Sequence, residues 1–147
     1  MSNNSGFMGK ITLRKVKKVD WDFILELRNN PDFKTFFYDQ HKITKREHYA
    51  YLKLQKNNKN FFNWIILLDN IKVGYVRILN NDVSIMVDPQ YHGKNIGTKA
   101  LKLLESEAKK LKIKKLIGRV MLYNKKSAKI FEKNGYKLLM YWYEKKL

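Results

Sequence analysis

The chain has 147 residues, a formal net charge of +18 and no cysteine, and its length fits one compact domain. Without cysteine it has no disulfide framework, thiol nucleophile or zinc–thiolate site. Because the three histidines are scattered along the chain, we expect no metal. No apolar run approaches the roughly 18 residues of a membrane span, so we expect a cytoplasmic protein without membrane association. Residues 1–9 are interpreted as a polar leader, which could derive from an expression vector, before a single domain at 10–147.

The positive charge comes almost entirely from lysine, which supplies 26 of the 31 basic residues. Base-specific contacts and bidentate phosphate contacts favour arginine. We therefore interpret the charge mainly as a compositional bias and do not expect a nucleic-acid partner. The positive field would nevertheless attract a small polyanionic ligand.

Apolar periodicity and turn signals predict ten elements. In chain order they are a strand, two helices, three strands, a helix, a strand, a helix and a strand, over residues 10–16, 19–30, 44–55, 61–69, 72–79, 82–88, 97–112, 114–122, 124–136 and 137–146. Asp20 is a candidate N-cap of the first helix, and Thr44 with Glu47 forms a capping box for the second. Residues 31–43 are rich in aromatic side chains and are expected to be irregular.

The spacing of these elements predicts an α/β domain built on a mixed sheet. The three central strands are joined by the hairpin-short connections Asn70-Ile71 and Asn80-Asn81, which favour an antiparallel meander. The strand–helix–strand unit at 82–122 predicts one parallel pair. We therefore expect a mostly antiparallel sheet with one parallel strand pair, flanked by about four helices.

The stretch "VDPQYHGKNIGTKAL" at 87–101 combines a strand end, a glycine-containing turn and the start of a helix. Free backbone N–H groups at a helix N-terminus bind anions, and Gly93 and Gly97 would let the backbone approach one. The alternative is a tight turn with no ligand. Neither a P-loop nor a dinucleotide fingerprint is present.

Together with downstream residues, this stretch resembles the core motif of the GNAT superfamily of N-acetyltransferases. The matching positions are Val87-Asp88-Pro89, His92 to Gly97, Asn124, Ala128, Phe131 and Gly135-Tyr136. The resemblance implies the GNAT fold, with the parallel strands splayed apart, and acetyl-CoA as the acyl donor. It also implies direct transfer of the acetyl group to a primary amine.

The resemblance assigns cofactor contacts residue by residue. Backbone amides from Gly93 to Thr98 would hold the pyrophosphate, and Met86 and Val87 would pair with the pantetheine arm. Lys126 or Lys133 would meet the 3′-phosphate. The implied cofactor-binding residues are Met86, Val87, His92, Gly93, Lys94, Asn95, Ile96, Gly97, Thr98, Asn124 and Phe131.

Three positions depart from the family pattern. His92 stands where Gln or Arg is usual, and Asn95 stands where a glycine is expected, although Asn tolerates a positive φ. Phe131 stands where many members carry a tyrosine that protonates the leaving thiolate, so that acid is missing. Candidate bases are Asp82, which could instead only close a hairpin, and His48, which could be a surface or capping histidine.

The segment at 27–52 resembles acetyltransferases of nucleotide-linked amino sugars, including the pseudaminic-acid pathway type. It implies Arg28, Phe37, Tyr38 and His48 as acceptor-binding residues, with packing of the aromatic side chains on the sheet as the alternative. The acceptor is expected to be an amino sugar or another small amine. A protein N-terminal acetyltransferase of the ribosomal-protein type and a non-catalytic acyl-CoA-binding or nucleic-acid-binding module stay open, as does the choice between monomer and homodimer.

Overall fold

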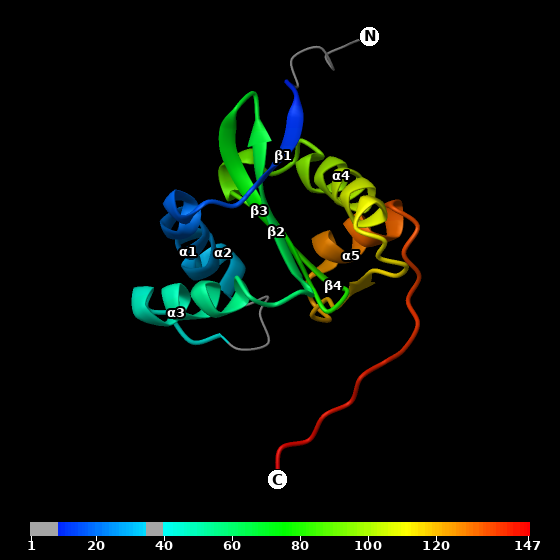
Figure 1. Ribbon diagram of the computed structural model, residues 1–147. Helices are drawn as coiled ribbons and strands as arrows, with labels where there is room; N and C mark the ends of the chain where they lie inside the picture. The colour runs from blue at the N-terminus through cyan, green and yellow to red at the C-terminus, as the bar shows by residue number, and fades with distance from the viewer. Residues whose placement is uncertain (1–8, 35–39) are drawn as a thin grey trace.

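The computed structural model describes residues 9–34 and 40–147. A five-stranded sheet runs through the molecule, with helices on both faces (Figure 1). The elements in chain order are β1 (Ile11–Lys15), η2 (Lys18–Asp20), α1 (Trp21–Asn29), α2 (Pro31–Lys34), α3 (Lys45–Gln55), β2 (Phe61–Leu68), β3 (Ile71–Leu79), β4 (Asp82–Val87), η3 (Pro89–Tyr91), α4 (Ile96–Lys110), β5 (Ile117–Gly118) and α5 (Lys125–Lys133).

The sheet has the strand order β1-β2-β3-β4-β5. The first four strands form antiparallel pairs, and β4 pairs with β5 in parallel through Asp82 with Ile117 and Val83 with Gly118. The predicted meander and the predicted parallel pair are both confirmed. Because pairing with β5 stops at Val83, the rest of β4 has an open edge on that side.

Each face of the sheet carries its own apolar core. One face packs on α4 through Ile96, Leu101 and Leu104, and the other packs on α1 and α2. The periodicity of the predicted helix at 97–112 is confirmed, since Ala108 lies on the same buried face, but Leu111 is exposed beyond the helix end. Alternation along the strands supplies both cores, because successive side chains point to opposite faces.

In the N-terminal third of the chain, the predicted capping box of α3 is confirmed, but the prediction that Asp20 caps α1 is wrong. Thr44 Oγ1 accepts from Glu47 N, and the Glu47 carboxylate accepts from Thr44 N. Asp20 precedes α1 without capping it; its carboxylate is buried and pairs with Arg14 and Lys72. A buried carboxylate needs cationic partners, and β1 and β3 bring two within reach.

Further differences concern the irregular segment and the C-terminal third. Residues 31–34 are helical rather than irregular, and β5 has only two residues of the strand predicted at 114–122. No strand forms at 137–146, where the side chains are exposed. This segment runs past the β5 side of the sheet and away from the rest of the molecule (Figure 1). A strand needs a hydrogen-bonded neighbour, and a local pattern alone does not provide one.

Candidate functional site

The predicted anion-binding turn connects β4 to α4. Asp88 caps the short helix η3, because its Oδ1 accepts from Gln90 N at 3.0 Å. Gly93 then has a φ of +81°, and a side chain there would meet no atom within 4 Å. Asn95 has a φ of +59°, which Asn adopts more readily than other non-glycine residues. The turn therefore forms with asparagine in place of the usual glycine.

The turn leaves the N-terminus of α4 uncapped. Asn95 occupies the N-cap position, but its side chain makes no capping hydrogen bond. The first four N–H groups of a helix have no partner within the helix, and here they belong to residues 95–98. These amides lie within the predicted cradle, and α4 is a 15-residue helix whose dipole favours an anion at this end.

Gly97 serves helix packing. It is buried, and a Cβ at this position would lie 2.8 Å from Ile130 Cδ1 of α5. The missing side chain lets α5 approach the first turn of α4. Of the two glycines in this motif, Gly93 supplies the positive φ of the turn, and Gly97 leaves room for the terminal methyl of Ile130.

Alternation along β4 decides which backbone groups face its open edge. Asp88 N donates to Val73 O of β3, so the backbone of Met86 also faces β3. On the other side, Ile117 N of β5 donates to Asn81 O, which places the odd-numbered residues toward β5. Ile85 and Val87 therefore present their backbone to the open edge. Met86 instead contributes a buried side chain to the core under α1.

His92 binds the turn to the end of β4. Its Nε2 donates to Val87 O at 2.8 Å, and its ring contacts Phe33 of α2 edge-on at 5.9 Å. Because the Val87 carbonyl is occupied, the Val87 N–H and the Ile85 backbone are the groups that remain for an added strand-like ligand. Ile85 was not among the residues singled out from the sequence, although alternation from the Asn80-Asn81 hairpin could have indicated it.

Asn124 caps α5. Its Oδ1 accepts from Ser127 N at 3.2 Å, and its main-chain oxygen accepts from Ala128 N. Asn124 also lines the cavity between the turn, α2 and α5. The motif thus uses one side chain both to begin a helix and to face the site.

Phe131 packs against the sheet at the point where β4 and β5 separate. A Cβ on Gly118 would lie 2.7–2.8 Å from three atoms of the Phe131 ring, so β5 requires glycine there. The same ring contacts Tyr136 at 5.0 Å between centroids. Phe131 therefore positions α5, and it brings no acidic hydrogen to the site. Burial is the main cause that raises the pKa of Tyr136 above its ordinary value.

A cavity of about 400 Å³ lies where the turn, α2 and the start of α5 meet. It is lined by Asp32, His92, Tyr123, Asn124, Lys125 and Lys126. The predicted residues His92, Asn124 and Lys126 are thus brought together. The lining is completed by Asp32, Tyr123 and Lys125. Tyr123 and Lys125 could have been expected there from the sequence only because they flank Asn124.

Asp82 binds two arginines at the opposite end of β4. Its Oδ1 accepts from Arg119 Nε at 3.1 Å, and its Oδ2 lies 3.5 Å from Arg77 Nη1. The contact with Arg119 connects β4 to the segment after β5. The carboxylate is 15% exposed, so its access to solvent is limited.

His48 connects α3 to α1. It is 3% exposed, and its Nε2 donates to Trp21 O at 2.8 Å. Burial is the main cause that lowers the pKa of His48, and the nearby Arg28 charge lowers it further. Arg28 lies in the last turn of α1. Phe37 and Tyr38 lie outside the described residues.

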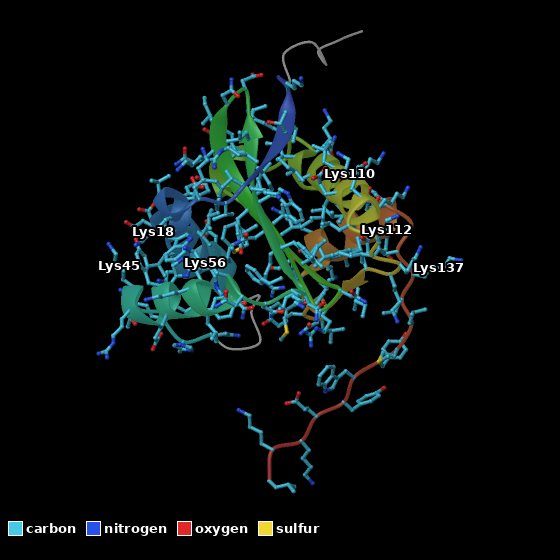
Figure 2. The ribbon with its side chains drawn as sticks, viewed as in Figure 1. Lys18, Lys45, Lys56, Lys110, Lys112 and Lys137 are labelled. Atoms are coloured by element: carbon cyan, nitrogen blue, oxygen red, sulfur yellow. The ribbon has the colours of Figure 1, made fainter. Side chains whose placement is uncertain are left out.

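Lysines are spread around the molecule. Figure 2 labels Lys18, Lys45 and Lys56 on the side of α1–α3 and Lys110, Lys112 and Lys137 on the opposite side. Three of them lie over an aromatic ring: Lys56 Nζ is 5.5 Å and Lys18 Nζ is 6.0 Å from the centre of the Trp21 ring, and Lys45 Nζ is 5.2 Å from the centre of the Tyr49 ring. The labelled lysines thus place positive charge on both sides of the described structure.

Within residues 9–34 and 40–147, no helix is long and apolar enough to cross a membrane. The same residues contain no group of three or more histidine, aspartate or glutamate side chains placed to hold a metal ion.

The sequence profile of the acetyltransferase (GNAT) domain family matches residues 10–137. The chain belongs to this family. A curated relative, an uncharacterized protein of Methanocaldococcus jannaschii, is 33% identical over 139 residues, which cover 87% of this chain. The chain spans only 28% of the length of that relative.

Solved structures share the fold. A domain from Methanocaldococcus jannaschii superposes with a TM-score of 0.78 at 30% identity, covering 87% of this chain and 88% of that one. Spermidine N-acetyltransferase from Vibrio cholerae, in complex with CoA and spermine, gives 0.76 at 18% identity, with 85% and 79% covered. A putative acetyltransferase from Salmonella typhimurium, with its cofactor acetyl-CoA, gives 0.71 at 18% identity, with 86% and 79% covered.

Proposed function

We propose that this chain is an acetyl-CoA-dependent N-acetyltransferase that acetylates a small primary amine by direct transfer. The observation that carries the proposal is the uncapped N-terminus of α4 beside the open edge of β4. A helix N-terminus binds phosphate, and an open strand edge binds an extended chain. A ligand in which a pyrophosphate is joined to an extended pantetheine arm would occupy both of these binding elements.

The residues present fit acetyl-CoA. Amides of residues 93–98 would bind the pyrophosphate, and the backbone of Ile85 and Val87 would pair with the pantetheine amides. Asn124 Nδ2 would donate to the same arm, and Lys126 would meet the 3′-phosphate beside the cavity. When bound, acetyl-CoA supplies an activated acetyl thioester.

Asp82 is the better of the two candidate bases. It lies on β4, the strand proposed to hold the donor, whereas His48 is buried on α3 with Nε2 engaged by Trp21 O. We propose that Asp82 takes the proton of the incoming ammonium through water. Phe131 supplies no proton, so the leaving thiolate relies on solvent, at a cost of up to about 10²–10⁴-fold relative to general acid catalysis.

The net charge of +18 favours an acceptor that also carries negative charge. A polycation such as spermidine would be repelled, and a nucleotide-linked amino sugar would be attracted. Arg28, in the last turn of α1, is the proposed contact for the negative group. We therefore place nucleotide-linked amino sugars first among the small amines.

A substrate panel tests the reaction. UDP-amino sugars, spermidine and a peptide with a free N-terminus are each supplied with acetyl-CoA, and release of the CoA thiol is recorded. The chain has no cysteine and adds no background thiol. Fastest release with a UDP-amino sugar supports the proposal. Fastest release with the peptide, or no release with any amine, contradicts it.

A glycine pair tests the phosphate cradle. Gly93 and Gly135 have φ values of +81° and +85°, and neither has an atom within 4 Å of a would-be Cβ. Alanine at either costs about 1–2 kcal/mol of stability through the same backbone strain. Calorimetry should show CoA binding weakened about tenfold, or about 1.4 kcal/mol, by Gly93→Ala and unchanged by Gly135→Ala. Equal CoA affinities in the two variants would refute the cradle.

A further inference from the structure

The face of the sheet that packs on α1 and α2 (Figure 1) changes character along its strands. Ile65, Tyr75 and Met86 lie side by side on β2, β3 and β4, because Tyr75 is the register partner of both other residues. Each of the three is at most 4% exposed, and all belong to the apolar core on this face. Up to this row, the face has the composition that packing against helices requires.

The next row on the same face is polar. Residues two apart along a strand point to the same side of a sheet, so Asn63, Arg77 and Ser84 follow the apolar row on β2, β3 and β4. Arg77 is the register partner of both Asn63 and Ser84. The three side chains, here called the polar row, therefore form one line across the central strands. At a strand spacing of about 4.8 Å, this line is about 10 Å long.

The polar row is recessed in the molecule. The side chain of Arg77 is only 19% exposed, and Asn63 and Ser84 are half-buried. A polar sheet face that simply met solvent would extend its charged side chains into water, as Arg119 does with 65% of its side chain exposed. Recessed polar groups on central strands need hydrogen-bond partners.

Much of the hydrogen-bonding capacity of the row is unused. Arg77 donates only through Nη1, to Asp82 O at 3.3 Å and to Asp82 Oδ2 at 3.5 Å, although a guanidinium has five N–H donors. Asn63 Nδ2 donates to the Tyr75 hydroxyl at 3.3 Å. In the part of the chain that the structure describes, Arg77 Nε and Nη2, Asn63 Oδ1 and Ser84 Oγ make no hydrogen bond. These groups can therefore serve a ligand.

The chemistry of the row favours a ligand with several hydroxyl groups. A guanidinium, which only donates, stands between a carboxamide oxygen, which accepts, and a serine hydroxyl, which does both. Hydroxyl groups, which also donate and accept, complement all three. Beside the row, Arg77 and Arg119 place two positive charges against the single negative charge of Asp82, and this balance disfavours a polycation.

We propose that the polar row binds the hydroxyl groups of an amino-sugar ring, with Arg77 as the residue that determines specificity for the sugar. The inference rests on the proposed function, in which Asp82 is the base. Asp82 lies on the same face of β4, two residues from Ser84, so a ring on the row has its amine beside this carboxylate.

The end of α1 borders the same face of the sheet. Leu27, the neighbour of Arg28, packs in one apolar core with Tyr75. Arg28, proposed above for the negative group of the acceptor, thus follows a residue that is anchored on this face. A nucleotide-linked sugar would have its phosphates near the end of α1 and its ring on the polar row.

Binding measured without turnover tests the row. Because Arg77 also contacts Asp82, a loss of activity alone would not separate sugar recognition from an effect on the base. UDP-glucosamine and UDP are therefore titrated by calorimetry into protein saturated with CoA, which has no acetyl group to transfer. The native chain should bind UDP-glucosamine about tenfold more tightly than UDP.

Two substitutions in the row should remove this difference without affecting UDP. Arg77→Lys keeps the charge but loses the planar fork of donors, and it should weaken UDP-glucosamine binding about tenfold. Ser84→Ala, a small change that keeps the strand, should weaken it about two- to tenfold. Arg46→Lys, at an exposed position on α3, is the matched control and should change neither affinity. Thermal unfolding checks that each variant is folded.

The possible outcomes separate this inference from the proposed function. Equal affinities of the native chain for UDP-glucosamine and UDP, or native affinity for UDP-glucosamine in both Arg77→Lys and Ser84→Ala, would overturn the role of the row. If CoA thiol is still released with UDP-glucosamine in that case, the proposed function stands without the row. If UDP-glucosamine binding depends on Arg77 but no amine releases CoA thiol, the row stands and the proposed function fails.

Discussion

The buried carboxylate of Asp20 allows a prediction whose size can be worked out from its contacts. Arg14 donates to both oxygens at 2.9 and 3.0 Å, Lys72 Nζ lies 2.8 Å from Oδ1, and Lys17 N donates to Oδ2 at 2.7 Å. Asp20→Asn keeps the shape but removes the negative charge, leaving two cations without a buried counterion. Because Arg14 and Lys72 are 30% and 36% exposed, water can solvate them, and the loss is about 1–3 kcal/mol, or about 2–12 °C in Tm at about 2–4 °C per kcal/mol.

Asp22 provides the matched control two residues further on. It is exposed, and it lies 3.5 Å from Lys45. Asp22→Asn should cost about 0–1 kcal/mol, as for other surface pairs. Thermal and urea unfolding of both variants measure the difference. If Asp20→Asn loses no more stability than Asp22→Asn, the reasoning from burial and pairing is wrong.

The same contacts predict how stability depends on pH. Burial alone would raise the pKa of Asp20, but the hydrogen bonds from Arg14, Lys72 and Lys17 N hold it well below its usual range. Since the pKa in the unfolded chain is about 3.9, the contribution of Asp20 is complete above that pH. It is lost as pH falls from about 4 toward the pKa of the folded state. Asp20→Asn should therefore lose stability less steeply than the native chain in acid.

Three further substitutions test positions around the site. Gly118→Ala pushes a Cβ into the Phe131 ring and should cost about 1–3 kcal/mol by urea unfolding; adding Phe131→Leu should recover part of that loss, and no recovery would refute the contact. Asn124→Ala should cost about 1 kcal/mol through the lost cap, while Asn124→Asp should keep the stability; equal losses by thermal unfolding would contradict the capping role. His48, whose pKa is lowered mainly by burial, supports the fold above about pH 6.5 and less as pH falls. Urea midpoints of His48→Gln should therefore change less between neutral and mildly acidic pH than those of the native chain, and an unchanged slope would contradict this.

Local patterns were sufficient for most of the elements and for the family. The hairpin-short links at Asn70-Ile71 and Asn80-Asn81 predicted the meander, because register and turn length are local properties. The capping box of Thr44 and Glu47 was also confirmed. The turn, Asn124 and Phe131 carried the resemblance to the family, and Asn124 and Phe131 meet short-range demands of a cap and a packed ring.

Only the tertiary structure decided what distant residues do together. Asp20 looked like an N-cap, but β1 and β3 bring Arg14 and Lys72 to it, and charge pairing prevails over capping. Gly97 also lies against Ile130 of α5, a contact that its place in the turn motif did not indicate. Strand propensity at 137–146 was real, yet a strand also needs a partner edge, and the local sequence does not specify where that edge is. The sequence by itself therefore determined the elements and the motif, and the three-dimensional packing determined their contacts.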